Sequence, residues 1–180
     1  MRIVGGYLKS RRLATFKGDF IRPTADNVRE SLFNIIGGRI RGAAFLDLFC
    51  GTGAVGIEAL SRGAERVVLN DRSKESLAVL KKNLSLLNIA DKVSVSCKDA
   101  EAFADMSAEK FDMIYIDPPY AAGEKAVPHN IADILNDGGI AVFESETPFS
   151  GEIEGLAISD RRKYGRVHLT FFIKTDGDKQ

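Results

Sequence analysis

The 180-residue chain has no tryptophan and only two cysteines, Cys50 and Cys97. Two cysteines are too few for a disulfide framework, and their spacing matches no common metal-binding motif. Each lies in an apolar run that is typical of a strand, so we expect both to be small packing residues. Because nothing points to an oxidising compartment, we expect the protein to act in the reducing cytoplasm.

Long apolar runs are also missing. No segment approaches the roughly 20 apolar residues that cross a bilayer, and the amino terminus lacks the charged-then-apolar pattern of a signal peptide. The composition, 44% hydrophobic and 28% charged residues, is ordinary for a soluble globular protein. The length predicts about one domain, and we expect no membrane partner.

The chain as a whole has no excess of charge of one sign, because 25 basic residues balance 25 acidic ones. The distribution is uneven, however. Residues 1–41 hold nine Lys/Arg and three Asp/Glu, a net charge of +6, which leaves −6 for residues 42–180. A basic first segment favours contact with a polyanion such as nucleic acid. On charge alone, a solvated basic surface explains the asymmetry nearly as well.

The first forty residues predict an arm and a helix. Residues 2–9 alternate short apolar pieces around a glycine pair, which is typical of a hairpin or an extended arm. Thr24 can then cap a helix that ends at a second glycine pair. The apolar face of this helix consists of Val28, Leu32, Ile35 and Ile36. We therefore expect a basic arm, residues 1–22, and a main body, residues 23–180, within one domain.

From residue 43 onward, predicted strands alternate with predicted helices. The predicted strands are residues 43–49, 66–70, 92–97, 111–116, 140–143 and 167–173. The predicted helices are residues 54–62, a helix that carries Leu77, Leu80, Leu84 and Leu87 on one face, and residues 130–135. This alternation implies βαβ units and a mostly parallel sheet, whose ligands bind at the carboxyl ends of the strands. We therefore expect the chemistry just after Phe49, Asn70, Cys97 and Ile116.

A glycine-rich turn follows the strand of residues 43–49. Gly51, Gly53 and Gly56 match G-x-G-x-x-G, and Asp71 lies twenty residues after Gly51. This spacing suggests a dinucleotide site, with a pyrophosphate at the amino end of the helix and the acid on a ribose. Asp47 argues against that hypothesis. Its carboxylate would repel a pyrophosphate, whereas it would attract a ligand that carries sulfonium and ammonium charges.

The run D-L-F-C-G-T-G, residues 47–53, resembles the first motif of class I S-adenosylmethionine methyltransferases. The resemblance implies an α/β, Rossmann-like fold with a mostly parallel, seven-stranded sheet flanked by helices. It also implies that Gly51 and Gly53 let the backbone approach the cofactor, with Asp47 and Phe49 in the same binding site.

Two later acids gain roles from the same resemblance. Asp71 would receive the ribose hydroxyls, and Asp99 would contact the adenine amino group, with Ala100 lining the base pocket. Taken singly, either acid could be an ordinary helix cap or loop residue. Three acids at three successive strand ends, Asp47 included, favour a cofactor site.

The predicted strand of residues 111–116 runs directly into Asp117-Pro118-Pro119-Tyr120. Two prolines have fixed φ and donate no backbone hydrogen bonds, so they stiffen the turn and leave nearby carbonyls free to accept. A carboxylate, a rigid carbonyl and an aromatic ring on one turn suit a planar substrate with an amino group. Without the glycine turn before it, the same tetrapeptide could be a plain strand-ending turn.

This D-P-P-Y resembles the fourth motif of methyltransferases that act on adenine N6, cytosine N4 or guanine N2. The resemblance implies that Asp117 and the Pro118 carbonyl hydrogen-bond the amine, while Tyr120 stacks on the base and Pro119 keeps the turn stiff. Catalysis then comes from positioning and electrostatics, without a metal. A base in folded nucleic acid would have to leave its stack to enter.

Arg22-Pro23-Thr24 and residues 28–34, V-R-E-S-L-F-N, together with both motifs, resemble the RsmD family. These are bacterial methyltransferases that modify guanine N2 in small-subunit ribosomal RNA. The resemblance covers nearly the whole chain and includes Lys163-Tyr164-Gly165. It implies S-adenosylmethionine as cofactor and ribosomal RNA, in an assembled or assembling small subunit, as partner. It places Thr24 near the cofactor or the active site.

The arm is the part expected to touch the RNA, and we expect the protein to work as a monomer. Our candidates for phosphate contacts are Arg11, Arg12, Lys17 and Arg22. The arm has few aromatic residues for stacking on single strands, so shape and phosphate contacts should dominate.

Four other hypotheses account for part of the sequence. A DNA adenine methyltransferase would need extra sequence for recognising its site, and a protein glutamine methyltransferase tends to carry Asn in place of Asp117. A nicotinamide-dependent oxidoreductase conflicts with Asp47, and an RNA-binding module without activity leaves D-P-P-Y unexplained. His129 and His168 show no pattern of partners for catalysis or metal binding, so we expect surface or packing roles for them.

Overall fold

The computed structural model describes residues 1–16 and 23–175, and side chains in the second range from residue 26 onward. The strands are β1 (Ala44–Asp47), β2 (Arg66–Asn70), β3 (Ser94–Ser96), β4 (Phe111–Ile116), β5 (Leu135–Ser145), β6 (Leu156–Tyr164) and β7 (Val167–Lys174). The α-helices are α1 (Pro23–Ile36), α2 (Ala54–Ser61), α3 (Lys74–Leu87) and α4 (Ala100–Met106). Short 3-10 helices are η1 (Gly37–Ile40), η2 (Ala90–Lys92) and η3 (Gly123–Ala126).

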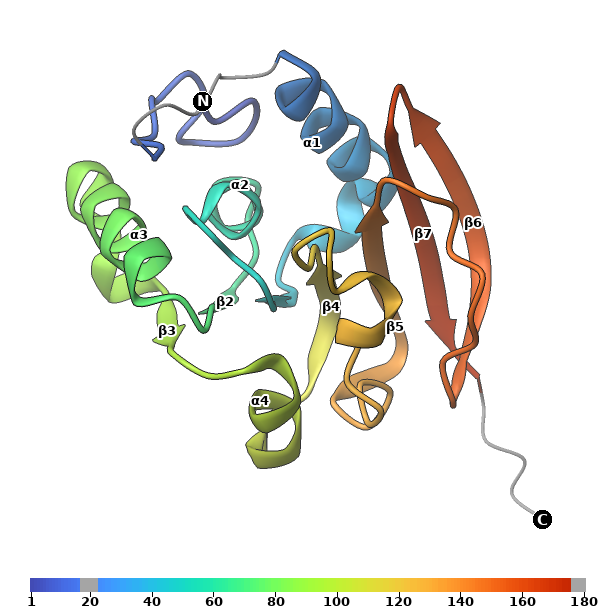
Figure 1. Ribbon diagram of the computed structural model, residues 1–180. Helices are drawn as coiled ribbons and strands as arrows, with labels where there is room; N and C mark the ends of the chain where they lie inside the picture. The colour runs from blue at the N-terminus through green and yellow to red at the C-terminus, as the bar shows by residue number, and fades with distance from the viewer. Residues whose placement is uncertain (17–22, 176–180) are drawn as a thin grey trace.

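The strands form one sheet in the order β3-β2-β1-β4-β5-β7-β6 (Figure 1). Strands β1 to β5 are parallel, whereas β7 runs antiparallel to both β5 and β6. This confirms the mostly parallel, seven-stranded sheet. The strand order reverses between β1 and β4, and at such a switch point the carboxyl ends of the strands open a crevice.

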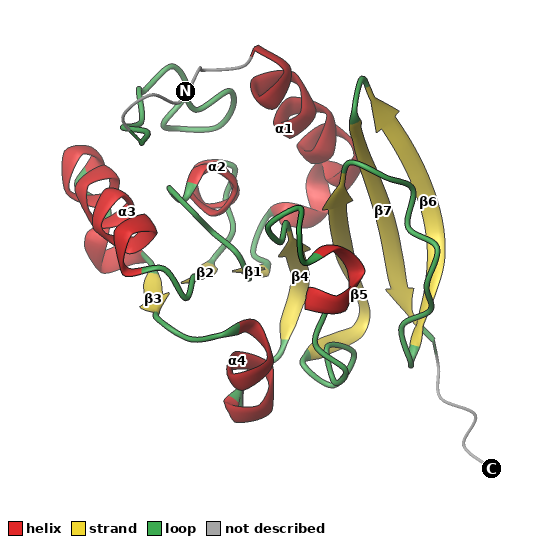
Figure 2. Cartoon of the chain, viewed as in Figure 1, coloured by secondary structure: helices red, strands yellow, loops and turns green. Residues whose placement is uncertain are grey.

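Alternate strand residues point into two separate cores. Phe45 and Val67 pack with α1, α2 and α3 on one face, while Leu46 and Val68 pack with α4 on the other. Figure 2 shows the three helices and α4 on opposite sides of the sheet. The central strands are covered on both faces, which explains why their sequences are nearly continuous apolar runs.

Residues 1–16 form a compact loop that packs on α2. An antiparallel bridge between Arg2 and Arg12 closes the loop, and the Leu8 amide donates a 2.9 Å hydrogen bond to the Ser61 hydroxyl. Gly6 adopts a φ of 75°, and a Cβ there would lie 1.8 Å from the Ser61 carbonyl oxygen. Both glycine's φ range and its lack of a side chain are therefore needed at this contact. In place of the expected hairpin, residues 1–16 thus form a loop with a single β-bridge, and hydrogen bonds to α2 hold this loop in place.

One sequence-based assignment of an element is wrong, and one is right in kind but too long. The segment 130–135, predicted as a helix, is a series of tight turns in which Ile131 bonds back to Pro128 and Asp133 to Asn130. A helix over residues 130–135 would make few hydrogen bonds to offset the unfavourable nucleation of its first turn, and Leu135 already begins β5. The strand predicted for residues 92–97 is reduced to Ser94–Ser96, at the edge of the sheet.

Strand β6 and helix α4 were not among the predicted elements. Strand β6 lies at the sheet edge and contains D-R-R-K, residues 160–163, whose side chains are largely exposed. Edge strands favour such charges because they discourage pairing with other chains, but the charges hide the apolar alternation. Helix α4 has only seven residues, too few to show a helical period clearly.

Candidate active site

A cleft runs along the carboxyl ends of the parallel strands, as the topology requires. Its main cavity has a volume of about 620 Å³ and is lined from β1, β4, β5, α1 and the loop of residues 1–16. Two further cavities, of about 450 and 270 Å³, continue the cleft past β2 and β3. Phe49 lines all three cavities, and Tyr120 lines the larger two. The cofactor and catalytic residues that the sequence suggested and that the structure describes with their side chains all lie along this cleft or directly beneath it.

Thr24 belongs to α1, but its side chain lies outside the described residues. Lys17 and Arg22 lie outside them entirely.

The glycine turn forms the floor of the cleft between β1 and α2. Gly51 and Gly53 have φ values of 53° and 85°, a range that favours glycine. A Cβ at Gly53 would lie 2.3 Å from Leu80, and one at Gly56 would lie 2.1 Å from Leu69. Gly53 and Gly56 are thus required by packing beneath the turn. Gly51 has no atom within 4 Å of an added Cβ, so its backbone faces open space that a ligand can fill.

Asp47 ends β1 beneath this turn and is almost fully buried, at 1% exposure. Its carboxylate accepts a 2.9 Å hydrogen bond from the Gly56 amide. The pKa of Asp47 is raised to about 7, mainly by burial and in smaller part by the negative charges of Asp71 and Glu144. The hydrogen bond from Gly56 opposes this rise. A cation in the main cavity would favour the charged carboxylate, which agrees with the argument against a pyrophosphate.

Asp71 follows β2 and organises two loops at once. Its carboxylate accepts hydrogen bonds of 2.8 Å from the amides of Gly51 and Ser73. Beside it, the buried Asn70 side chain donates to the carbonyls of Leu48 and Lys98, 3.1 Å away in each case. Asp71 therefore has the structural role of a loop acid, yet it lines the cavity and retains lone pairs for a ligand hydroxyl. Asn70, which the sequence did not single out, connects the loops that follow β1 and β3.

Asp99 caps α4 by accepting a 3.2 Å hydrogen bond from the Glu101 amide. Its other carboxylate oxygen lies 3.7 Å from Arg72, and both side chains are mostly exposed. Ala100 is buried behind it and lines the same small cavity as Phe49. These residues line a recess of about 270 Å³ at the end of β3. Arg72, which the sequence analysis missed, lines this recess as well.

The turn of residues 117–120 borders both larger cavities. Pro118 is buried, whereas Pro119 and Tyr120 are exposed. The Pro119 carbonyl accepts a 2.8 Å hydrogen bond from the Ala122 amide, while no backbone amide of the described residues bonds to the Pro118 carbonyl. The Pro118 carbonyl is therefore open to a ligand, whereas the Pro119 carbonyl already accepts one hydrogen bond.

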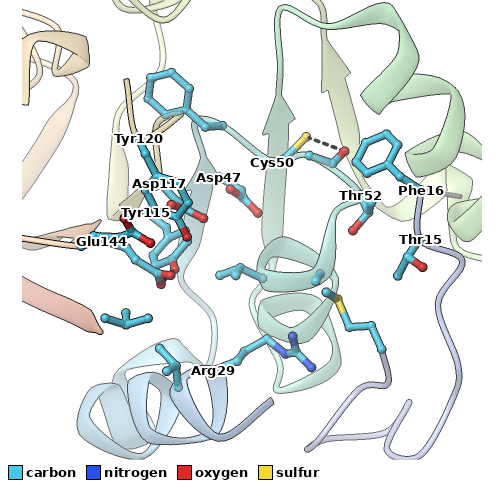
Figure 3. Close-up of a pocket in the computed structure, with 18 of the residues that line it drawn as sticks. Thr15, Phe16, Arg29, Asp47, Cys50, Thr52, Tyr115, Asp117, Tyr120 and Glu144 are labelled. Atoms are coloured by element: carbon cyan, nitrogen blue, oxygen red, sulfur yellow. Dashed lines mark hydrogen bonds between the residues drawn. The ribbon is translucent and has the colours of Figure 1, made fainter. Parts of the chain in front are cut away.

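The Asp117 side chain lies at the wall of the main cavity, close to Glu144 and Asp47 (Figure 3). Burial raises the pKa of Asp117 well above its usual value, and the charges of Glu144 and Asp47 add to the effect. Three carboxyl groups thus converge on one side of the cavity, and each favours a ligand that brings positive charge or hydrogen-bond donors.

Sequence reasoning missed Glu144 and Tyr115, which stand beside Asp117 in Figure 3. Glu144 lies near the end of β5, and the Tyr115 hydroxyl of β4 donates a short hydrogen bond to it. Burial raises the pKa of Glu144 although the Tyr115 hydrogen bond and the Arg29 charge oppose this shift. A lone glutamate at a strand end carries no local sequence signal. Its partner comes from another strand, so only the sheet register reveals the pair.

Arg29 lies in the V-R-E-S-L-F-N run and is buried at 4% exposure beneath the cavity. Its guanidinium donates to the Arg2 carbonyl and to Asp26, and its Nε lies 3.4 Å from a carboxylate oxygen of Glu58. Glu58, fully buried on α2, also accepts a 2.8 Å hydrogen bond from the Val4 amide. This network holds the loop of residues 1–16 against α1 and α2, which fixes one wall of the cavity.

The mouth of the main cavity lies between two basic segments. Thr15 and Phe16 line it on one side, and Gly165 and Arg166 of the β6–β7 turn line it on the other. In the loop that ends at Phe16, the candidates Arg11 and Arg12 are exposed. Sequence reasoning did not propose the β6–β7 turn for RNA contact, although Lys163-Tyr164-Gly165 belonged to the resemblance.

The cysteine prediction holds for one residue and fails for the other. Cys50 is buried in the core, where burial raises the pKa of its thiol, whereas Cys97 is exposed. Cys97 lies beyond the short edge strand β3, which leaves it without a covering layer. His129 is also exposed and contacts Glu101, with Asp105 close enough that the three could share one metal ion. The sequence gave no sign of this surface cluster.

In the described ranges, no helix combines the length and the apolar character that crossing a membrane requires. The family described as Conserved hypothetical protein 95 matches residues 1–173 of the chain. The chain is 34% identical to "Putative rRNA methyltransferase YlbH" of Bacillus subtilis, an alignment that covers 97% of this chain and 99% of that protein. It is 33% identical to "Ribosomal RNA small subunit methyltransferase D" of Escherichia coli, over 86% of this chain and 76% of the other.

Solved structures agree on the fold. The structure titled "Putative methyltransferase yhhF from Escherichia coli" aligns with a TM-score of 0.85 and 30% identity over 97% of each chain. A putative methyltransferase named SMU.776, complexed with SAH according to its title, aligns with a TM-score of 0.66 but only 18% identity, so it supports the fold alone. These likenesses confirm the class I methyltransferase fold and the resemblance to the RsmD family.

Proposed function

Since the chain belongs to the family described as Conserved hypothetical protein 95, we propose that it transfers a methyl group from S-adenosylmethionine to N2 of a guanine in small-subunit ribosomal RNA. The observation that carries this proposal is the convergence of Asp117, Glu144 and Asp47 on one cavity, continuous with the glycine turn. Such a site accepts hydrogen bonds and positive charge. A methyl sulfonium and an amino-bearing base bring both.

The cleft fits the cofactor in shape as well as charge. Open space above Gly51 allows a ligand to approach the backbone, and the buried Asp47 favours a cation nearby. We assign Asp71 to the ribose hydroxyls, and the recess of Asp99 and Ala100 to the adenine. When bound, S-adenosylmethionine supplies a methyl group that is already activated, so the protein needs no metal to activate it.

The chain's own task is to orient the amine. The lone pair of an exocyclic amine is delocalised into the ring, so the nitrogen is a weak nucleophile. The Asp117 carboxylate and the Pro118 carbonyl can accept hydrogen bonds from its two N–H groups, which turns the lone pair toward the methyl group. Tyr120, exposed at the cavity mouth, can stack on the base and hold it in line. The converging carboxylates also stabilise the positive charge that develops on the nitrogen.

The RNA should lie across the cavity mouth, held on both sides. Arg166, an exposed cation, lines the cavity on one side, and Lys163 is exposed on the strand that leads into the same turn. On the other side, Arg11 and Arg12 are exposed in the loop whose Thr15 and Phe16 line the cavity. Phosphates on either side of the target nucleotide can pair with these two segments while its base enters the cavity. Lys17 and Arg22 remain candidates from the sequence.

A transfer assay tests the proposal directly. Small ribosomal subunits that lack their native methylations are incubated with the protein and S-adenosylmethionine labelled in its methyl group, and the RNA is then digested to nucleosides. Label in N2-methylguanosine is the expected result. Label in another nucleoside would overturn the choice of base, and label only in DNA or protein acceptors, supplied in parallel, would overturn the choice of substrate.

A further inference from the structure

Glu144 and Tyr115 form a pair across the sheet at the main cavity. Strands β4 and β5 are parallel, with Tyr115 in register with Val142, two residues before Glu144. The Tyr115 hydroxyl donates a hydrogen bond to Oε2 of Glu144, and the tyrosine side chain is buried at 4% exposure. A rigid, buried donor therefore fixes the direction of the carboxylate. No described residue donates to its other oxygen, Oε1, which is left for a ligand in the cavity.

Two carboxyl groups share this wall of the cavity. Glu144 is close enough to Asp117 to raise the pKa of that residue, and both side chains line the same space. The charge of Arg29 acts on Glu144 by lowering its pKa, but the Arg29 guanidinium is held by Asp26, Glu58 and the Arg2 carbonyl. When both groups are ionised, the wall offers a ligand two adjacent acceptors, and a ligand with a donor edge favours that ionised form because it hydrogen-bonds to the carboxylates.

Among the common bases, guanine matches two adjacent acceptors best. Its N1–H and its 2-amino group are neighbouring donors on one edge. Adenine N1 and cytosine N3, which lie next to the amino groups of those bases, are acceptors and would face a carboxylate unfavourably. A polar group that loses its hydrogen-bond partner on burial destabilises a complex more than a satisfied hydrogen bond stabilises it. Two adjacent carboxylates can therefore reject a base that presents an acceptor to one of them.

We propose that Glu144 determines base specificity, by accepting a hydrogen bond from guanine N1–H while Asp117 holds the 2-amino group. Tyr115 is the positioning residue that orients the Glu144 carboxylate. This inference rests on the proposed function and deepens it, because it names the residue that distinguishes guanine from the other amino-bearing bases.

The test compares two RNA substrates that differ only at the target nucleotide, guanosine or 2,6-diaminopurine riboside. Diaminopurine keeps the 2-amino group, but its N1 is an acceptor. For the wild-type protein we expect kcat/KM to be about 10- to 100-fold higher on guanosine. Glu144→Gln should lower kcat/KM on guanosine and narrow or invert this ratio, because the glutamine amide can donate to N1 of diaminopurine. Tyr115→Phe should narrow the ratio partially.

Controls separate this role from others. Asp137→Asn, at the opposite end of β5 with a side chain 93% exposed, should leave the ratio unchanged. Affinity for S-adenosylmethionine, measured by calorimetry, should change less than about twofold in Glu144→Gln, which also reports that the variant is folded.

Three results would overturn the inference. An equal loss on both RNAs with weaker cofactor binding would place Glu144 against the cofactor. An equal loss on both with cofactor binding intact would make it structural. Absence of transfer by the wild-type protein to either RNA would overturn the proposed function itself, and the inference with it.

Discussion

The acidic groups at the two ends of the cleft have different surroundings. At the end that we assign to the ribose and the adenine, the ribose end, the carboxylates of Asp71 and Asp99 accept hydrogen bonds from backbone amides of nearby loops. At the end that we assign to methyl transfer, the transfer end, Asp47 accepts one backbone amide, and the carboxyl groups of Asp47, Asp117 and Glu144 lie near one another with raised pKa values. The carboxylates of the ribose end have hydrogen-bond partners without a ligand, whereas those of the transfer end destabilise one another when they are ionised.

This difference separates the work of the two ends. The ribose end is preformed, so it should contribute affinity through shape and hydrogen bonds that change little during the reaction. The ionised carboxylates of the transfer end are stabilised only when a cationic ligand or a base edge with hydrogen-bond donors is present. These groups should therefore act mainly on the chemical step. Changes at the two ends should therefore separate into effects on binding and effects on turnover.

The largest expected effect is at Asp117. Asp117→Ala should lower kcat about 10²- to 10³-fold, because the amine loses an acceptor that orients it in the transition state. Affinity for S-adenosylmethionine should stay within about threefold of wild type. Single-turnover methyl transfer and calorimetry measure the two quantities, with Asp133→Ala, an exposed acid, as the control. Equal losses in binding and turnover would make Asp117 structural and remove the contrast between the two ends.

Asp71→Ala should have the opposite signature. Loss of hydrogen bonds to a charged group, about 1.5–3 kcal/mol, corresponds to a roughly 10- to 100-fold weaker affinity for S-adenosylmethionine. At saturating cofactor, kcat should change little. Part of the loss would come from the loop, because Asp71 also holds the amides of Gly51 and Ser73. Asp91→Ala, an exposed acid in η2, serves as the control, and unchanged affinity in Asp71→Ala would remove the ribose assignment.

The pH dependence of cofactor binding probes the transfer end. Burial raises the pKa of Asp47 to about 7, so in the ligand-free protein it is mostly neutral at pH 6 and mostly charged at pH 8. A cationic ligand prefers the charged form, so affinity should rise about tenfold from pH 6 to pH 8 and then level off. Asp117 and Glu144 titrate in the same direction, so Asp47→Asn should remove only the share that belongs to Asp47. Affinity that is flat with pH in the wild-type protein would contradict a cation beside these groups.

The two ends also differ in how far the sequence predicts them. Asp47, Asp71 and Asp117 each follow an apolar strand within a few residues of a glycine turn, a helix start or a proline pair, so local patterns identify them. Glu144 has no such mark, and nothing local distinguishes it from Glu146, two residues later. Its importance comes from Tyr115 on a neighbouring strand, a contact that depends on sheet register.

The same limit applies to the framework around the site. The alternation of strands and helices predicted the parallel part of the sheet, because buried strands are apolar throughout. It missed β6, since exposed charges on an edge strand conceal the pattern. Arg29 was visible in a family-like run of residues, but its buried network with Glu58 joins α1 to α2 and could not be inferred from either helix alone. Tertiary contacts between distant segments are what the sequence leaves out.

The smallest expected effect lies outside both ends, at the mouth of the cavity. Lys163→Ala combined with Arg166→Ala should weaken RNA binding about 3- to 10-fold, since exposed ion pairs contribute little each. The slope of log affinity against log salt should fall by about 1.5–2, because two phosphate contacts are lost. Arg41→Ala with Lys110→Ala removes the same charge from two exposed cations that precede β1 and β4, at the end of the parallel strands opposite the cleft, and should leave the slope nearly unchanged. If both pairs changed the slope equally, the RNA would be attracted by overall charge alone, and the β6–β7 turn would have no particular role in holding it.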